Sequence, residues 1–559
     1  MRKPITRVAL VGAGLSLVAL GAAPLAAGGA SAASADNRST ASPIKHLVVI
    51  FQENVSFDHY FGTYPNAANT SGQPFVPAPD TKPVNGLTQE LLTANPNAAN
   101  PQRLDPAITK DVLTCSQGHA YTEEQSAFDL GKMDKFVEET GTIGTGPTGD
   151  PCFATDVMNY YDGNTVTGYW NYAQHFSMSD NSFGSTFGPS TVGAINLASG
   201  DTGGVTRAIR GGAGPADVVA DGRLGFSVIG DPQPFYDDCS TRDSVALSGK
   251  NIGDQLNAAG RSWGFFQGGF HPDAVYTGAP DTTLSYDPEF TKQMKVKCTA
   301  KHNIVAALGG TGQWGTKGDY IPHHEPFQYY QSTANPHHLA PASLTAIGTD
   351  TRTPGMFDTA NHQYDMSDFD SLVTAIHDGT VPASNLPAVS FLKAPGYQDG
   401  HAAYSDPIDE QTFVVNEINA LEQLPTWSST AVIVAYDDSD GWYDHAYSGV
   451  HNPSQTTADT LTGAGTCGQG DSLAGQQGRC GYGPRLPLLV ISPWARANYV
   501  SHRLTDQSSI LKFVEGNWGL GKIRGSFANI AGSLRPMFNF DGAGQNPALL
   551  LDPATGQPR

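Results

Sequence analysis

The chain has 559 residues, 15% of them charged, and a formal net charge of -21 at pH 7. A chain this acidic has no basic stripe to replace the counterions of a nucleic acid, which excludes a nucleic-acid-binding protein. If the substrate is anionic, its attraction must come from a local site, and a metal ion with histidines is the obvious source. The 63 glycines and 38 prolines predict long ordered loops around a modest number of regular elements.

The first 35 residues have the pattern of an export signal. Three basic residues precede a short apolar stretch at residues 8–20, and a small-x-small cleavage site follows at residues 30–32 or 33–35. The apolar stretch is short and contains glycine, which favours a cleaved signal over a retained membrane anchor. We therefore predict a secreted protein whose mature chain, residues 36–559, carries no transmembrane anchor.

Short apolar runs followed by turn or polar residues predict buried strands at residues 46–51, 388–392, 431–436 and 486–491. Helical spacing of apolar residues predicts helices between or after them, at residues 192–197, 408–423 and 508–516. This alternation predicts an α/β fold with a mostly parallel central sheet covered by helices on both faces. We expect residues 36–559 to form a single catalytic domain with long loop insertions near residues 64–113 and 268–318. Two domains stay an alternative, because composition marks no boundary.

The cysteines agree with export. There are six of them, none in a Cys-x-x-Cys or clustered Cys/His arrangement, and an even number in an exported chain predicts disulfides. Many connectivities are open, and pairing between neighbours along the chain is the simplest: Cys115 with Cys152, Cys239 with Cys298, and Cys467 with Cys480. Six buried thiols would be expected only if the chain were not exported.

Glu53 and Asn54 directly follow the first predicted strand. A carboxylate beside a carboxamide offers two hard oxygen donors to a divalent ion, and the Asn54 amide can also donate to a phosphate oxygen. For an isolated Glu-Asn pair, simple capping of the following helix by Asn54 or Ser56 is the stronger alternative.

Ser190 follows Gly188-Pro189 just ahead of a predicted helix. A serine at a helix start can have its oxygen near backbone N–H groups, a geometry that suits a nucleophile attacking an anionic phosphorus centre. An ordinary N-cap is the competing interpretation.

The predicted strand at residues 431–436 ends in Asp437, Asp438, Asp440, Asp444 and His445. Acids at the carboxyl end of a strand are how an α/β enzyme presents a metal or a charged substrate group. An EF-hand is excluded, because tyrosines stand where its first acid and its closing glutamate belong. A solvated acidic loop is the plain alternative.

Three separated histidines, His119, His324 and His401, lie in predicted loops. Histidine can ligate a metal, donate to phosphate oxygens or protonate a leaving alkoxide near neutral pH. Each of them, taken singly, is as well explained by a structural role.

Taken in order, these segments resemble the bacterial secreted phosphoesterases of the phospholipase C and acid phosphatase type, within the alkaline-phosphatase-like superfamily. Residues 53–62 read Glu-Asn-Val-Ser-Phe-Asp-His-Tyr-Phe-Gly, which is similar to the family's opening motif. Further matches follow in the same order at residues 115–121, 131–136, 180–183, 188–191, 324–330, 400–401, 436–445 and 483–494. The resemblance covers almost the whole mature chain.

The resemblance implies an alkaline-phosphatase-like fold in which Ser190 attacks phosphorus and is transiently phosphorylated. It also implies one or more divalent metal ions, whether calcium, magnesium, manganese, zinc or iron, bound by Glu53, Asn54, Asp437 and Asp438 with the Ser190 oxygen. By the same resemblance His119, His324 and His401 surround the phosphate with Asn54, and one of these histidines protonates the leaving oxygen. Asp440 and Asp444 are expected to shape the loop. His445 receives no role.

Phospholipase C activity, which releases a phosphorylated head group from a phospholipid at a membrane surface, is the leading expectation. An acid phosphatase acting on phosphomonoesters is the runner-up, and a non-catalytic secreted protein that binds phosphate or a surface polymer is the third hypothesis. Departures from the family pattern keep the runner-up open: Val55 replaces an arginine, residues 191–196 lack the Pro-Asn-Arg or Pro-Asn-His that often follows the nucleophile, and the C-terminal modules of larger phospholipases have no match.

Overall fold

The computed structural model describes residues 40–209, 217–274, 296–306, 312–351, 359–542 and 546–559. The predicted export signal and part of the predicted insertion at residues 268–318 lie outside these ranges. Contacts between residues group Ser39–Arg559 into one unit. No helix in the described ranges is both long and apolar enough to span a membrane.

An eight-stranded sheet forms the centre of this unit. Its strands, in spatial order, are β14 (Gln363–Asp365), β11 (Trp263–Gln267), β15 (Val389–Lys393), β1 (His46–Gln52), β16 (Thr430–Tyr436), β17 (Leu488–Ile491), β4 (Ser177–Ser179) and β18 (Tyr499–Ser501). All of them run in one direction except β17, which is antiparallel to β16 and to β4. The sheet is therefore mostly parallel, as predicted.

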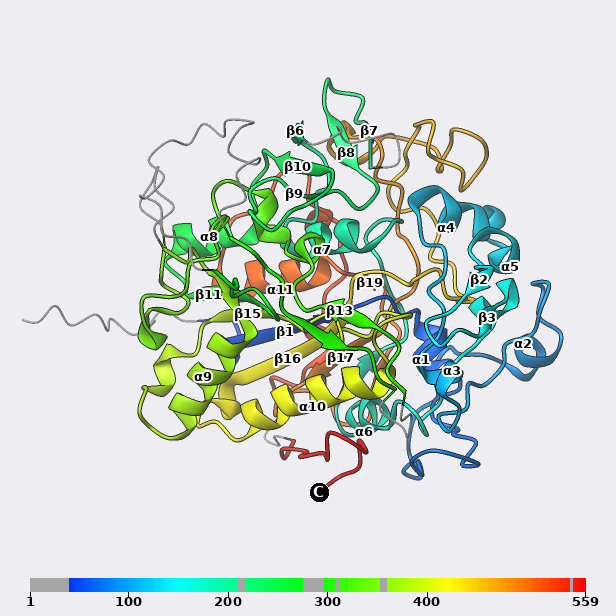
Figure 1. Cartoon of the computed structure of the whole chain (residues 1–559), viewed down its shortest axis with the longest axis horizontal. Coiled ribbons are helices and arrows are strands. Elements are labelled where there is room, and N and C mark those ends of the chain that lie inside the picture. The colour runs from blue at the N-terminus through cyan, green and yellow to red at the C-terminus, as the bar shows by residue number, and fades with distance from the viewer. Residues whose placement is uncertain (1–39, 210–216, 275–295, 307–311, 352–358, 543–545) are drawn as a thin grey trace, which may run out of the picture. The chain divides into compact units, whose positions relative to one another are not determined.

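Helices cover both faces of the sheet (Figure 1). On one side lie α6 (Thr167–His175), α9 (Met366–His377) and α10 (Pro407–Glu422), and on the other lie α7 (Ser190–Ala198), α8 (Ile252–Ala259) and α11 (Ser509–Trp518). Double coverage explains the continuous apolar runs: every residue of β16 is buried, so its side chains on both faces are apolar or small. The predicted α/β fold class is confirmed.

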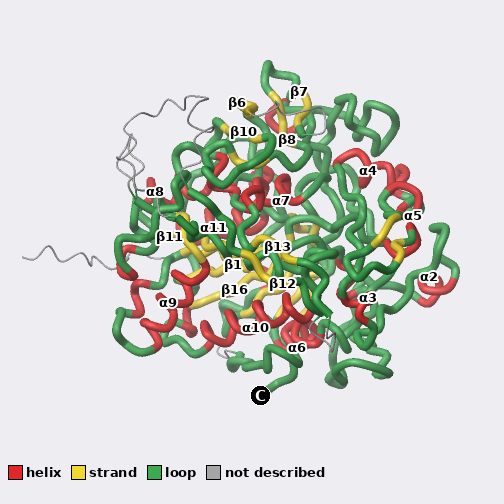
Figure 2. Tube along the Cα trace, in the orientation of Figure 1, coloured by secondary structure: helices red, strands yellow, loops and turns green. Residues whose placement is uncertain are grey.

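Loops and short elements make up much of the rest (Figure 2). The short helices are α1 (Phe57–Phe61), α2 (Gln89–Thr93), α3 (Thr109–Val112), α4 (Tyr121–Ala127) and α5 (Phe136–Glu139). The remaining strands pair in small sheets: β2 (Gly144–Thr145) with β3 (Pro151–Cys152), β5 (Ser182–Phe183) with β19 (Thr505–Asp506), β7 (Val218–Ala220) with β8 (Phe226–Val228), β12 (Lys301–Asn303) with β13 (Thr316–Gly318), and β10 (Ser244–Leu247) with β6 (Val205–Ile209) and β9 (Gln233–Pro234).

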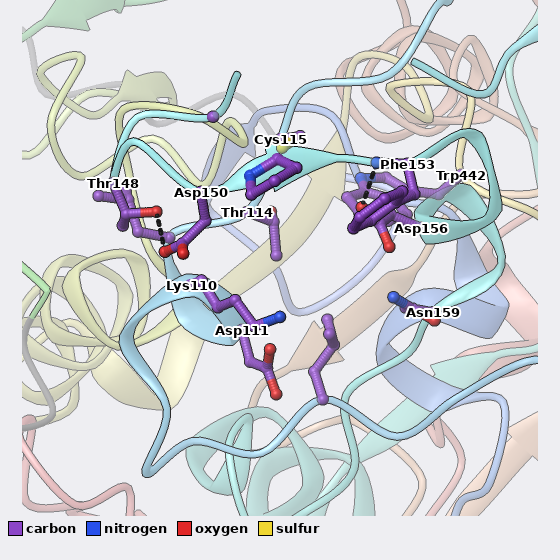
Figure 3. A pocket seen from close by; sticks show the side chains of 14 residues that line it. Lys110, Asp111, Thr114, Cys115, Thr148, Asp150, Phe153, Asp156, Asn159 and Trp442 are labelled. Carbon is purple, nitrogen blue, oxygen red and sulfur yellow. Dashed lines mark hydrogen bonds between the residues drawn. The ribbon is translucent and has the colours of Figure 1, made fainter. Parts of the chain in front are cut away.

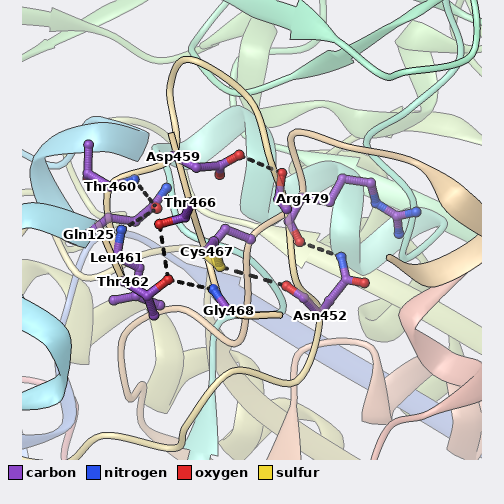
Figure 4. The surroundings of a disulfide bond; sticks show 12 residues. Gln125, Asn452, Asp459, Thr460, Leu461, Thr462, Thr466, Cys467, Gly468 and Arg479 are labelled. Atoms are coloured by element: carbon purple, nitrogen blue, oxygen red, sulfur yellow. Dashed lines mark hydrogen bonds between the residues drawn. A yellow bond between two sulfur atoms is a disulfide. The ribbon is translucent and has the colours of Figure 1, made fainter. Parts of the chain in front are cut away.

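The three disulfides join the predicted neighbours, Cys115 to Cys152, Cys239 to Cys298, and Cys467 to Cys480. Around the third, the Cys467 sulfur lies 3.8 Å from the Asn452 carbonyl oxygen, and the Asn452 side chain donates to the carbonyl of Arg479 (Figure 4). This disulfide therefore ties together a long loop that follows the acidic end of β16. The simplest sequence pairing is confirmed.

Candidate active site

The carboxyl ends of β1 and β16 present the site. The two strands are adjacent and parallel, with Gln52 opposite Tyr436, so Glu53 and Asn54 leave the sheet beside Asp437. The backbone N–H of Asn54 donates to Asp437 Oδ1 over 3.1 Å. Asn54 has φ 55°, a left-handed conformation that costs energy in a residue other than glycine and is common at functional sites. This hydrogen bond joins the segment after β1 to the segment after β16, which lie 383 residues apart in the sequence.

Ser190 is the first residue of α7 and faces both strand ends. Its Oγ lies 3.0 Å from Glu53 Oε2, 3.2 Å from Asn54 Oδ1 and 2.9 Å from Asp438 Oδ2. A hydroxyl has one proton to donate, so it can satisfy only one of these three acceptor oxygens at a time. The cluster therefore holds more acceptors than its own donors can satisfy.

A lysine that sequence reasoning missed also enters this cluster. Lys393 is the last residue of β15, the strand on the other side of β1, and its ammonium contacts Glu53 Oε1 and lies 3.7 Å from Asp437 Oδ2. Its position in the sequence could have indicated a site residue, because Lys393 directly follows the predicted strand at residues 388–392. Only the spatial order of the strands shows that this lysine meets Glu53.

Charge in the cluster is not balanced. Glu53, Asp437 and Asp438 are all buried, and Lys393 supplies one positive charge against their three carboxylates. Burial raises the pKa of Glu53 and of Asp438 well above the usual range, and it raises the pKa of Asp437 to about 6. A cation would remove the need for protons on these acids.

The donor set fits a divalent cation. Asp437 Oδ2 is buried and accepts no hydrogen bond, and Glu53, Asn54 and Asp438 all turn an oxygen toward Ser190. Carboxylate and carboxamide oxygens are the ligands that hard divalent cations prefer. The set Glu53, Asn54, Ser190, Asp437 and Asp438 is thus brought together as expected from the sequence.

His119 lies beside Asn54, with its Nε2 3.5 Å from Asn54 Nδ2. The other ring nitrogen lies 2.9 Å from the Gln117 carbonyl oxygen and 3.2 Å from Asp440 Oδ1. Although burial opposes the charged imidazole, Asp438 and Asp440 raise the pKa of His119 to about 10. Asp440 therefore orients a predicted site histidine as well as shaping its loop.

His324 and His401 complete the predicted histidines. His324, in a short 3-10 turn at Pro322–His324, places Nδ1 3.0 Å from Glu53 Oε1. The His401 ring packs edge-on to His119 with centroids 6.2 Å apart and stacks on Tyr404 at 4.4 Å. Burial lowers the pKa of both histidines well below the usual range. All three therefore lie around the Glu53–Asn54 strand end.

Two of the groupings of metal-ligand atoms that occur among the described residues lie at this strand end. Atoms of Glu53, His324 and Asp399 lie within 4.8 Å of one another, and so do atoms of His119, His401 and Asp440. Asp399 was missed by sequence reasoning, since it lies in a loop without a neighbouring acid. Its backbone carbonyl accepts from the Glu53 N–H, which fixes this loop to the end of β1.

Asp444, the remaining acid of the predicted strand end, belongs to a buried ion-pair network. Arg485 contacts Asp58 over 2.9 Å and Asp444 over 3.0 Å. His445, which had no role in the sequence analysis, lies 2.6 Å from Asp58 Oδ2 through Nδ1. This network joins α1, which follows Glu53 and Asn54, to the segment that follows Asp437 and Asp438.

A cavity of about 50 Å³ opens beside the Cys115–Cys152 disulfide (Figure 3). Lys110 and Asp111 lie on one side of it, and Asp156 and Trp442 lie on the other. A smaller cavity lined by Asn54 shares Thr114 and Trp442 with it. The larger of these two cavities therefore lies next to one that reaches Asn54, and none of the acids near Ser190 lines it.

Comparisons with known proteins agree with the resemblance carried by the motifs. Residues 44–521 match the sequence model of the Phosphoesterase family, and the chain belongs to that family. Hemolytic phospholipase C of Pseudomonas aeruginosa is 24% identical over 511 residues, which are 90% of this chain and 57% of that protein. Non-hemolytic phospholipase C of Burkholderia pseudomallei is 24% identical over 500 residues, 86% of this chain and 56% of that protein.

Phospholipase C B of Mycobacterium tuberculosis is 22% identical over 495 residues, 85% of this chain and 74% of that protein. The chain thus spans little more than half the length of the Pseudomonas and Burkholderia relatives. Among solved structures, murine ectonucleotide pyrophosphatase/phosphodiesterase 5 aligns with a TM-score of 0.28 at 10% identity, over 67% of this chain and 94% of that chain.

Proposed function

We propose that the protein is a secreted, metal-dependent phosphoesterase of the phospholipase C type, with Ser190 as its nucleophile. The observation that carries the proposal is the position of Ser190 Oγ, within 3.2 Å of oxygens of Glu53, Asn54 and Asp438 at the start of a helix. Family membership and relatives named phospholipase C support the substrate class.

The reaction divides between the serine and the histidines. The Ser190 hydroxyl passes its proton to the carboxylate of Glu53 or Asp438, both within hydrogen-bond distance, its oxygen attacks phosphorus, and the bond from phosphorus to the glycerol oxygen of the lipid breaks. One of His119, His324 and His401 gives that oxygen its proton, so that diacylglycerol leaves, and His119 is the one of the three whose pKa is raised and which therefore holds a proton at neutral pH. Water then gives a proton to the same histidine and cleaves the phosphoserine, which releases the phosphorylated head group, and the carboxylate returns its proton to the serine oxygen. The N-terminal N–H groups of α7 favour the anionic phosphoryl group throughout.

Glu53, Asn54, Asp437 and Asp438, together with the Ser190 oxygen, would hold the cation. When bound, it supplies a lowered pKa for the serine hydroxyl and charge neutralisation at the phosphoryl oxygens. An oxygen shell suits calcium, magnesium or manganese, whereas His324, which contacts Glu53, would admit zinc or iron. Lys393 stabilises the acids from the β15 side and leaves a charge of about -2 on the three carboxylates for the cation to balance.

An acid phosphatase that uses the same nucleophile is the second candidate. Its support is the segment after Ser190, where Thr-Val-Gly-Ala-Ile-Asn replaces the Pro-Asn-Arg or Pro-Asn-His expected from the phospholipase pattern. A non-catalytic binding protein is a weaker proposal, because such a protein needs no serine beside its acids. We further propose that residues 36–559 are one catalytic domain released by cleavage of the export signal.

Product analysis tests the function. The purified protein is assayed on phosphatidylcholine and on p-nitrophenyl phosphate, from acid to neutral pH, with and without a chelator. Diacylglycerol production that the chelator abolishes is expected, whereas orthophosphate from the monoester without lipid cleavage would favour the acid phosphatase. Hydrolysis of neither substrate would overturn both.

Ser190→Ala tests the nucleophile. Turnover should fall to background while the circular dichroism spectrum and metal content stay those of the unaltered protein. The exposed Ser367→Ala on α9 is the matched control and should keep full activity. Full activity of Ser190→Ala would remove Ser190 from the mechanism.

A further inference from the structure

A lysine on the β12–β13 hairpin lies close to the site histidines without taking part in the acid cluster. Lys317, in the middle of β13, places its Nζ 3.2 Å from the centre of the Tyr404 ring. The Tyr404 ring stacks on His401, and His401 packs against His119. A continuous series of rings therefore runs from the Lys317 ammonium to the residue beside Asn54.

The hairpin is fixed against the loop that follows β15. A Cβ atom added at Gly396 would lie 2.6 Å from the Gly318 carbonyl oxygen and 3.0 Å from Lys317 Cγ, so the two backbones pack with no room for a side chain. The same loop continues to Asp399, whose carbonyl accepts from Glu53. This packing holds Lys317 at the edge of the sheet where β1 and β16 end.

The Lys317 ammonium has no carboxylate partner within ion-pair distance in the part of the chain that the structure describes. Lys393 differs from Lys317, because it is fully buried and its ammonium contacts Glu53 and lies near Asp437. Lys317 is only half-buried, so it can meet a ligand that enters from solvent. Its charge acts on the site from this position, since after burial it is the main group that lowers the pKa of His401.

A lysine ammonium over an aromatic face is partly desolvated and keeps donors for an anion. The acids whose charge acts on it are Asp399 and Glu53, and the rings of Tyr404, His401 and His119 lead from it to Asn54. The group that both Ser190 and Lys317 could face is the anionic phosphate of a substrate.

We propose that Lys317 is a substrate-binding residue that contacts a non-bridging oxygen of the phosphate. The inference rests on the proposed phosphoesterase function and adds a specificity consequence. A phosphomonoester carries close to two negative charges at neutral pH and a phosphodiester carries one. Because attraction to a fixed charge scales with the ligand's charge, Lys317 favours monoesters more than diesters.

Binding of inorganic phosphate, measured by calorimetry on the metal-loaded protein, tests the contact without relying on turnover. Lys317→Met should weaken phosphate binding about tenfold or more, and Lys317→Arg should stay within about threefold of the unaltered protein. Lys301→Met is the matched control, because Lys301 lies on the partner strand of the same hairpin and is exposed. It should bind phosphate unchanged.

Kinetics test the specificity. In Lys317→Met, kcat/KM should fall more for p-nitrophenyl phosphate than for bis(p-nitrophenyl) phosphate, mainly through KM. Unchanged phosphate binding in Lys317→Met, or in Lys317→Gln should the methionine variant not fold, would overturn the proposal, as would no phosphate binding by the unaltered protein. Phosphate binding that depends on Lys317 in a protein that hydrolyses no ester would instead uphold the contact and overturn the proposed function.

Discussion

Gly193 on α7 lies directly against the backbone of Asp437, and a Cβ atom at position 193 would come within 2.1 Å of the Asp437 carbonyl oxygen. Both partners are backbone, so no side-chain rotation can make room. The helix that begins with Ser190 is therefore as close to the end of β16 as a polypeptide can be. This contact explains how the Ser190 hydroxyl reaches Asp438, the residue after Asp437.

Gly193→Ala should push α7 away from β16 and displace Ser190. We expect turnover to fall about 100-fold, since a shift of about 1 Å is enough for such a loss, and the free energy of unfolding to fall by about 1–3 kcal/mol. Steady-state kinetics and urea unfolding measure the two effects. The control is Gly516→Ala on α11, where no atom lies within 4 Å of the added Cβ, and it should stabilise the protein by about 0.5–1 kcal/mol. Wild-type turnover in Gly193→Ala would show that the contact does not position the serine.

Asp438→Asn should remove metal from the protein. The substitution keeps the shape of the side chain but takes one carboxylate charge from a buried oxygen cluster, so the proposed cation would lose a ligand charge that water does not replace. Metal content per chain after dialysis, measured by plasma mass spectrometry, should drop along with activity. Asp378→Asn, at an exposed position after α9, should retain both. Metal content equal to that of the unaltered protein would remove Asp438 from the ligand set.

Arg485→Met should destabilise the whole fold. It leaves Asp58 and Asp444, both buried, without the guanidinium that contacts them, and an uncompensated buried charge costs about 3–5 kcal/mol. Urea unfolding followed by circular dichroism measures the loss. Arg496→Met is the matched control: Arg496 is exposed and bonds one carbonyl, so a loss below about 1 kcal/mol is expected. Equal effects of the two substitutions would contradict a special role for the network.

Local pattern was enough to predict the strands and helices that carry the site. The predicted helices at residues 408–423 and 508–516 are α10, Pro407–Glu422, and α11, Ser509–Trp518, so only their ends differ. The parallel arrangement then predicts that acids after β1 and β16 meet, because parallel strands end at the same edge. For this reason the sequence could predict that Glu53 and Asn54 lie close to Asp437 and Asp438.

The sequence alone could not predict that three further residues belong to the site: Lys393, Asp399 and Lys317. Their roles depend on which strand lies next to β1 and on how two loops pack, and neither is encoded in local spacing. The ion pair between Asp58, on α1, and His445 joins positions 387 residues apart, and no local pattern around either residue points to the other. All of these contacts depend on how strands and loops that are far apart in the sequence pack against one another.

His445 makes the free energy of unfolding depend on pH. Burial opposes its charge, but Asp58 outweighs burial and raises the pKa of His445 above the ordinary 6.5. A histidine whose pKa is raised by folding contributes stability that is fully present below the unfolded pKa and is lost as pH rises through the folded pKa. The pKa of Asp58 is lowered by His445 and Arg485 against the effect of its burial, so this carboxylate stays charged through the same window.

His445→Gln should therefore destabilise the protein most on the acid side of neutrality. At about pH 6 we expect a loss of about 1–2 kcal/mol in the free energy of unfolding, and the difference from the unaltered protein should shrink as pH rises above the folded pKa. Urea unfolding between about pH 5.5 and pH 9 follows the trend. His502→Gln is the matched control, because His502 makes a similar contact with Asp180 but its side chain is 69% exposed, so solvent screening should keep its effect small at every pH. A loss in His445→Gln that grew with pH would mean that the neutral imidazole, rather than its ion pair with Asp58, is what stabilises this end of the site.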